Sequence, residues 1–276
     1  MKKNTKPVNK THSIAEVAFV FQFASDFIDA DINRVMSLKH ILKDQLPNME
    51  PIQAIGIQLQ GGSVNPPNFL PAKLMGVSFS CFGKDGSVEK LLKIEKNMVV
   101  VNVMTYTRWS AVWDEVRNYL QLVAEKISGP ENQVVTIGLT YIDRFVYEGK
   151  AMEYRCTDVF NEASEFLTSR AFKAGPYWHV HQGWFEPSEV APRCLNILNI
   201  NSADAGNEHH TTIEHRGVFQ FLDPISNIKS MFFGGDDESS KESKIDQFFT
   251  KLHENNKEVL LKTLSKEMIK EIQLEG

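Results

Sequence analysis

The stretch AEVAFVFQF, residues 15–23, carries an apolar side chain at every second position and predicts the first strand of the fold. The positions that share its apolar face are Val17, Phe19, Phe21 and Phe23. Beyond this strand, apolar residues return every three or four positions up to Leu46, which predicts a helix that Pro47 ends. The sequence therefore predicts a half-buried strand followed by an amphipathic helix.

The elements that follow this helix complete a first unit. Strand-like runs occur at 53–59, 77–81 and 91–106, and the last of them is apolar on both faces, as expected of a strand inside a sheet. The sequence GKDG after the second run predicts a hairpin turn. A second helix is predicted at 109–127, where apolar residues form one stripe.

The same order of elements then occurs a second time. The expected elements are a strand at 135–147, a helix from Thr157 or Asp158 to about Arg170, strands near 177–185, 193–201 and 211–222, and a long helical segment at 243–272 that breaks near Asn255 and Asn256. The sequence therefore predicts an α+β fold of two similar β-α-β-β-β-α halves, with mostly antiparallel sheets and helices packed on one face. The expected boundaries are a disordered tail at 1–12, a first half at 13–130 and a second half at 131–276.

Composition and charge limit the classes of function. The chain has 276 residues, of which 42% are hydrophobic and 24% charged, so it can bury a core. Its net charge of -5 argues against nucleic acid as a partner, because phosphate binding requires clustered Lys and Arg. The three cysteines form no disulfide or metal-binding pattern, and no apolar run reaches the length of a membrane span. We therefore expect a soluble cytoplasmic protein with no membrane partner.

Two stretches carry a resemblance to a known family: TYTRWSAVWDEV, residues 105–116, and VTIGLTYIDRF, residues 135–145. An aromatic-rich helix start, followed by a strand that ends in Tyr-Ile-(Asn or Asp)-Arg, resembles a sporadically distributed family of uncharacterised prokaryotic proteins of about this length. The resemblance covers most of the chain and implies the architecture and a bacterial or phage-like origin. The patchy distribution of the family implies a place among mobile or defence-associated genes, and the family offers no catalytic residues to carry over.

The second of these stretches contains two candidate ligand contacts, Asp143 and Arg144. Asp143 interrupts the apolar row of its predicted strand, and a carboxylate there must be paired, hydrogen-bonded or near the end of the sheet. Arg144 points to the opposite face if the strand is regular. We interpret the two residues as a structural ion pair or strand-end polar residues, with ligand contact as the alternative.

Aromatic residues at the start of the predicted helix 109–127 also allow two interpretations. Trp109 and Trp113 lie four positions apart, so they share one side of the helix. We interpret them as anchors of the helix on the sheet, with stacking on a ligand as the alternative.

Histidines are concentrated in the second predicted half, where five of the eight fall between residues 179 and 215. His179 and His181 form a His-x-His pair whose imidazoles share one strand face, opposite Trp178 and Trp184. This spacing suits a divalent transition metal, with Glu214, His209 or His210 as further ligands. We expect no metal as the first interpretation and keep this metal site as the alternative.

The residues that share this face with the two histidines predict a polar binding surface. Its candidate residues, drawn from three predicted strands, are Tyr177, His179, His181, Asn199, Asn201, Glu214, Arg216 and Gln220. Such a surface suits a small polar or anionic ligand or a protein partner. His215 shares the parity of apolar neighbours, so we expect it to be a hydrogen-bonded core histidine.

No phosphate loop, dinucleotide fingerprint, nucleophile elbow or HExxH motif occurs in the sequence. The sequence therefore favours a non-enzymatic cytoplasmic binding or adaptor protein with no cofactor and a groove between its halves. We expect self-association or a protein partner, in a mobile-element or phage-defence setting. The alternatives are a metal-dependent enzyme that uses the His-x-His pair and a nucleic-acid-binding accessory that uses Lys90, Lys93, Lys96 and Arg108.

Overall fold

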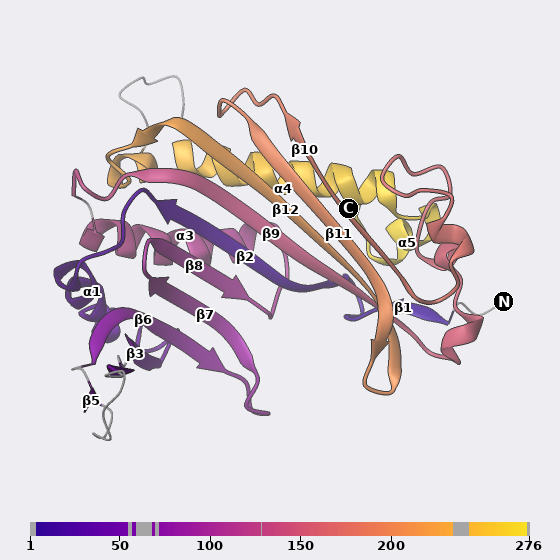
Figure 1. Cartoon of the computed structure of the whole chain (residues 1–276), viewed down its shortest axis with the longest axis horizontal. Helices are drawn as coiled ribbons and strands as arrows, with labels where there is room; N and C mark the ends of the chain where they lie inside the picture. Colours follow the sequence, from indigo (N-terminus) through magenta and orange to yellow (C-terminus); the bar gives the residue numbers. More distant parts are fainter. Residues whose placement is uncertain are drawn as a thin grey trace.

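The protein is built around one large antiparallel sheet with its helices on one face. The computed structural model describes residues 4–54, 57–58, 68–69, 72–127, 129–233 and 243–274. Within these ranges ten strands form the sheet, and every strand pair in it is antiparallel. Figure 1 shows α3 and α4 lying behind this sheet. The predicted α+β class and antiparallel pairing are confirmed.

The sheet has nine strands in one continuous order, and a tenth strand pairs with one of them. In spatial order the nine are β10 (Trp178–Glu186), β11 (Cys194–Ala205), β12 (Glu208–Ile225), β9 (Val134–Tyr147), β2 (Ile14–Phe23), β8 (Met98–Val103), β7 (Val88–Glu95), β6 (Lys73–Phe82) and β3 (Asn48–Ala54). The tenth strand, β1 (Thr5–Pro7), pairs with β9. A separate pair joins β4 (Ile57–Gln58) to β5 (Asn68–Phe69). The two strands that begin the predicted halves, β2 and β9, therefore lie side by side at the centre.

The helices are of very different lengths. They are α1 (Asp29–Met36), α2 (Lys39–Leu42), α3 (Trp109–Ile127), α4 (Lys244–Thr263) and α5 (Lys266–Glu271). Short 3-10 turns occur at Ala151–Glu153, Cys156–Asp158, Ala171–Lys173 and Lys229–Phe232. The helix predicted at 109–127 is confirmed residue for residue as α3.

The apolar face of β2 forms the centre of the core, as its alternation predicts. All four of its predicted apolar positions are buried. The Phe19 ring lies 5.8 Å from the ring of Trp113 on α3 and 5.3 Å from that of Phe249 on α4. Both long helices therefore pack against the same face of the sheet, and Trp113 anchors α3 there.

The expected disordered tail at 1–12 is partly wrong, because residues 5–7 form β1. Strand β9 continues past its last pairing with β2, at Asp143, and its next residues would otherwise have unpaired backbone groups. Strand β1 supplies that pairing, with Thr5 opposite Tyr147.

The run at 91–106, expected to be one strand, belongs to two. Strands β7 and β8 form a hairpin in which Glu95 pairs with Met98, so Lys96 and Asn97 make the turn. Lys96 has a φ of 53°, the left-handed conformation that such two-residue turns require. The sequence lacks the usual glycine at this turn, which is why alternation alone merged the two strands.

The GKDG turn between β6 and β7 is confirmed, with Gly86 at a φ of 82°.

The helix expected at 157–170 is absent, so the second half does not repeat the β-α-β-β-β-α pattern in full. The segment forms 3-10 turns and loops instead. Asn161 accepts a hydrogen bond from the backbone amide of Ala163, and Ser164 accepts one from that of Phe166. These local side-chain bonds hold the backbone amides in turns, which competes with a continuous helix.

The C-terminal helical segment breaks at Ser265 and not at Asn255 and Asn256. Both asparagines are buried within α4. The Ser265 hydroxyl accepts a hydrogen bond from the backbone amide of Met268 and so caps the start of α5.

Candidate functional site

The predicted polar surface lies on the face of the sheet that the helices leave open. His181 on β10 hydrogen-bonds through Nδ1 to Asn199 Oδ1 on β11. Asn199 donates from Nδ2 to Glu214 Oε2 on β12, 3.3 Å away. Arg216 donates from Nη2 to the other oxygen of Glu214, at 3.2 Å. The structure thus joins four of the predicted residues in one chain, but the charges of Glu214 and Arg216 already pair with each other.

The other predicted residues of this surface are less connected. Exposed His179 lies opposite Asn201 in the register between β10 and β11. Half-buried Arg144 lies opposite Thr212 in the register between β9 and β12. Tyr177 donates its hydroxyl proton to Asp204 Oδ2 at 2.8 Å.

The alternative metal ligands are divided between the two faces of the sheet. His209 is 2% exposed and lies on the covered face, where its Nδ1 is 2.9 Å from Asp204 Oδ1 and its Nε2 is 3.0 Å from Ser202 Oγ. His179, His181 and Glu214 belong to the open face, so the structure does not bring the four together. Within the described ranges, no group of three or more His, Cys, Asp or Glu side chains is placed to hold a metal ion.

His215 is a buried core histidine, as its parity predicts. Asn256 donates from Nδ2 to His215 Nδ1 at 3.2 Å, and His215 Nε2 lies 3.2 Å from Asn196 Oδ1. Burial lowers the pKa of His215 to about 4, so its imidazole is neutral near neutral pH.

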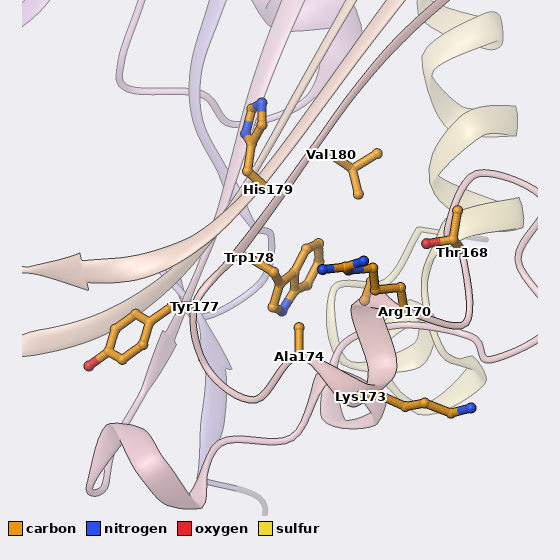
Figure 2. A pocket seen from close by; sticks show the side chains of 9 residues that line it. Thr168, Arg170, Lys173, Ala174, Tyr177, Trp178, His179 and Val180 are labelled. Atoms are coloured by element: carbon orange, nitrogen blue, oxygen red, sulfur yellow. The ribbon is translucent and has the colours of Figure 1, made fainter.

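A cavity of about 550 Å3 lies where the chain enters β10 (Figure 2). In Figure 2, Trp178 points to the side of Arg170, whereas Tyr177 and His179 point elsewhere and not toward one another. Arg170 lies on the side of Trp178, so the candidate residues Tyr177 and His179 do not converge with it. The indole Nε1 of Trp178 is buried without an acceptor among the described residues.

A second cavity, of about 440 Å3, does gather chemically distinctive groups. We call it the central cavity: it is bounded by the residues before β2, the start of α3, the middle of α4 and the residues after α5. The lining residues that carry its chemistry are Ser13, Tyr106, Trp109, Tyr141, Asp143 and His253. It lies on the covered side of the sheet, beside the central strands β2 and β9.

Asp143 is the most unusual group of the central cavity. The residue is 1% exposed, and its Oδ1 accepts a hydrogen bond of 2.7 Å from Ser13 Oγ. Its Oδ2 atom is buried and accepts no hydrogen bond from any residue in the described part of the chain. Burial raises the pKa of Asp143 to about 6, and the bond from Ser13 opposes this shift. A half-satisfied buried carboxyl group is therefore built into the cavity.

Neutral hydrogen-bonding groups surround this carboxyl group. The Tyr141 hydroxyl lies 2.8 Å from His253 Nδ1. Burial lowers the pKa of His253 to about 4, with a further contribution from Lys257, so the imidazole is neutral near neutral pH and Nδ1 can accept the tyrosine proton. Burial raises the pKa of Tyr106 to about 12 and raises that of Tyr141 well above its usual value. Both phenols therefore keep their protons.

The Trp109 ring forms a wall of the cavity and is not free for stacking. One neighbour is the His253 ring, with centroids 4.3 Å apart and planes inclined by 4°. Another is the Trp113 ring, 5.9 Å away and inclined by 5°. The protein itself therefore uses the faces of this indole, which agrees with its interpretation as an anchor.

Two cations complete the lining, Arg108 just before α3 and Lys257 on α4. Neither forms an ion pair with a described residue. The cavity thus combines one buried carboxyl group with two cations that no described carboxylate pairs with.

Sequence reasoning found part of this cavity. Asp143 and Arg108 were candidates, and Tyr106, Trp109 and Tyr141 lie within the two stretches that carry the family resemblance. Ser13, His253 and Lys257 were missed, and no local signal marks them. Their role depends on contacts across the whole chain.

The sequence matches no protein-family model, and no curated protein matches it. Among the helices that the structure describes, none is both long enough and apolar enough to cross a membrane.

Proposed function

We propose that this protein is a non-enzymatic, cytoplasmic binding protein that holds a small polar ligand in the central cavity. The observation that carries the proposal is the Asp143 carboxyl group, which is buried but has one oxygen without a donor among the described residues. Buried polar atoms in proteins are nearly always hydrogen-bonded, because an unsatisfied one costs about 1–3 kcal/mol. A ligand that donates a hydrogen bond would remove this cost on binding.

The position of the cavity supports a groove between two similar halves, which is part of the same proposal. From the centre outward, the strand order is β2, β8, β7, β6, β3 on one side and β9, β12, β11, β10 on the other, so the edge strand β3 has no counterpart. In the first set, β2 comes first in the chain and pairs with β8, the last of the consecutive strands β6, β7 and β8, and α3 follows. In the second set, β9 comes first and pairs with β12, the last of β10, β11 and β12, and α4 follows. On this reading, the 3-10 turns between β9 and β10 replace α1 and α2.

We further propose that the protein acts as an adaptor, which reports an occupied cavity to a second copy or to a protein partner. Support for a mobile-element or phage-defence setting comes only from the family resemblance of residues 105–116 and 135–145. Size-exclusion chromatography with light scattering tests the association. A strict monomer that captures no partner from its native source contradicts the adaptor role.

The test of ligand binding uses a variant that blocks the cavity. Ser110 lines the cavity and is exposed in the first turn of α3, so Ser110→Trp adds bulk there with little effect on the core. Asn118→Trp adds the same side chain at an exposed position of α3 that does not line the cavity, and it serves as the matched control. The probes are amino acids, amines, carboxylic acids, nucleosides and sugars, read out by thermal shift and by native mass spectrometry.

We expect at least one probe to raise the Tm of the wild-type protein and of Asn118→Trp but not that of Ser110→Trp. Equal stabilisation of all three proteins would place the binding elsewhere. If no probe stabilises the wild-type protein, the proposed function is wrong.

A further inference from the structure

From the charges of the central cavity we infer the class of its ligand: a small zwitterion that carries an ammonium group and a carboxylate, such as an α-amino acid. This inference rests on the proposed function, since it assumes that the central cavity holds a ligand. Three charged residues carry it, namely Asp143, Arg108 and Lys257.

Asp143 selects the ammonium end. Its Oδ1 atom is satisfied by Ser13, and its Oδ2 atom accepts no bond from the described residues, so the site requires a donor and not an acceptor. A hydrogen bond to a charged group contributes more than a neutral one, and an ammonium group is a compact donor that can also balance the buried negative charge.

The titratable groups near Asp143 are neutral, so Asp143 is the group among them that can recognise a charge on the ligand. Tyr106, Tyr141 and His253 are neutral near neutral pH, and burial also lowers the pKa of His12, which lines the cavity beside Tyr106. The Tyr141 hydroxyl is held by His253 Nδ1 at 2.8 Å. These side chains therefore offer polar contacts without a second carboxylate that could hold a dication.

Arg108 and Lys257 select the anionic end. They come from separate elements, the segment before α3 and the middle of α4, and both line the cavity. Neither is neutralised by a described carboxylate, as the ion pairs show. The first turn of α3 contains no acidic residue that would oppose an anion beside it.

Charge balance excludes ligands with only one of the two groups. A simple amine would pair with Asp143 but be repelled by the two cations, whereas a simple carboxylate would leave the buried Oδ2 atom without a donor. A zwitterion satisfies all three residues. The cavity volume of about 440 Å3 is also within the range of small-molecule sites, about 300–1,000 Å3.

Calorimetry on the full chain tests this inference with sets of three matched probes, and the three probes of a set share one amino-acid side chain. They are the α-amino acid, the amine that lacks its carboxylate, and the carboxylic acid that lacks its ammonium group. We expect at least one amino acid to bind, and both of its truncated partners to bind about tenfold more weakly or less.

Charge-removing variants assign each end. Asp143→Asn should weaken binding of the amino acid about tenfold without weakening binding of the carboxylic acid, whose repulsion by the buried carboxylate is removed. The double variant Arg108→Gln, Lys257→Gln should weaken binding of the amino acid and strengthen binding of the amine, because the repulsion of the ammonium group by the two cations is removed. Lys251→Gln, on α4 but outside the cavity lining, is the matched control and should bind as the wild-type protein does.

The outcomes separate this inference from the proposed function. If a nucleoside, a sugar or a singly charged probe binds in a way that Ser110→Trp abolishes, and no amino acid does, the zwitterion is wrong and the binding function stands. Amino acid binding that survives both sets of charge substitutions also overturns the inference. If no probe binds at all, both proposals fail.

Discussion

At the scale of single residues, Asp143 and His215 are both buried, but burial affects them in opposite directions. Burial raises the pKa of Asp143 to about 6 and lowers the pKa of His215 to about 4. His215 has a hydrogen-bond partner at each ring nitrogen, and the stability that its neutral form contributes is lost as pH falls from its unfolded pKa of 6.5 toward 4. Burial makes the charged form of Asp143 the unfavourable one, and no described residue donates a hydrogen bond to its Oδ2 atom that would offset this.

The raised pKa of Asp143 predicts a pH-dependent effect of Asp143→Asn. The folded protein holds this proton more tightly than the unfolded chain, whose Asp pKa is 3.8, so ionisation destabilises the ligand-free protein as pH rises toward and past 6. Asparagine has no charge to bury. We expect the free energy of unfolding of the variant, relative to wild type, to increase by about 1–2 kcal/mol between about pH 5 and about pH 7.5. Urea denaturation at both pH values measures it.

A matched control for this prediction is Asp114→Asn on α3, because Asp114 is exposed and its substitution removes no buried charge. Its effect relative to wild type should change little between the two pH values. If the difference in free energy of unfolding between Asp143→Asn and wild type is also the same at both pH values, ionisation of the buried carboxyl group does not destabilise the protein.

At the scale of elements, the sequence predicts what depends on neighbouring residues and misses what depends on distant ones. Alternation in 15–23 and helical periodicity in 109–127 identify β2 and α3, because each pattern reflects one buried face. The Lys96 turn and the segment 157–170 were misread, since their backbone follows from a turn without glycine and from local side-chain bonds. The bond from Ser13 to Asp143 joins positions 130 residues apart, which no local pattern can indicate.

The close approach of β6 and β7 gives a prediction at the same scale. A Cβ atom on Gly76 would lie 2.2 Å from the Ile94 backbone oxygen, and only a shift of the strands can relieve this contact. A Cβ atom on Gly138 would make ordinary contacts of 3.6 Å or more. We expect Gly76→Ala to lower the free energy of unfolding by about 2 kcal/mol or more and Gly138→Ala to change it by less than about 0.5 kcal/mol.

Urea denaturation of the two alanine variants, measured against wild type, checks this difference. Gly138→Ala is the control, since it places the same methyl group in another strand of the same sheet. Equal stability of the two variants would mean that β6 and β7 do not pack as closely as described.

At the scale of the whole molecule, the core does not divide at the expected boundary between 130 and 131. One apolar cluster contains the face of β2 with α1, α3 and the first half of α4, and it extends along β9 to Tyr141. A second cluster begins on β9 at Phe145 and contains the second half of α4 with α5. Asp143 lies between the two on β9, so the central cavity occupies the seam where the clusters meet.

Because β9 and α4 belong to both clusters, we expect the protein to unfold in one cooperative step. The tryptophans report on the clusters separately: Trp109 and Trp113 pack in the first, and Trp178 and Trp184 against the second. Replacing both tryptophans of one pair with phenylalanine leaves the fluorescence of the other pair, which reports on its own cluster. The urea midpoint from this fluorescence should equal the midpoint from far-UV circular dichroism. A fluorescence midpoint that precedes the circular dichroism midpoint in one variant would show that its cluster unfolds alone. The seam would then be a boundary between independent units, and a ligand in the central cavity would raise the stability of their contact more than that of either unit.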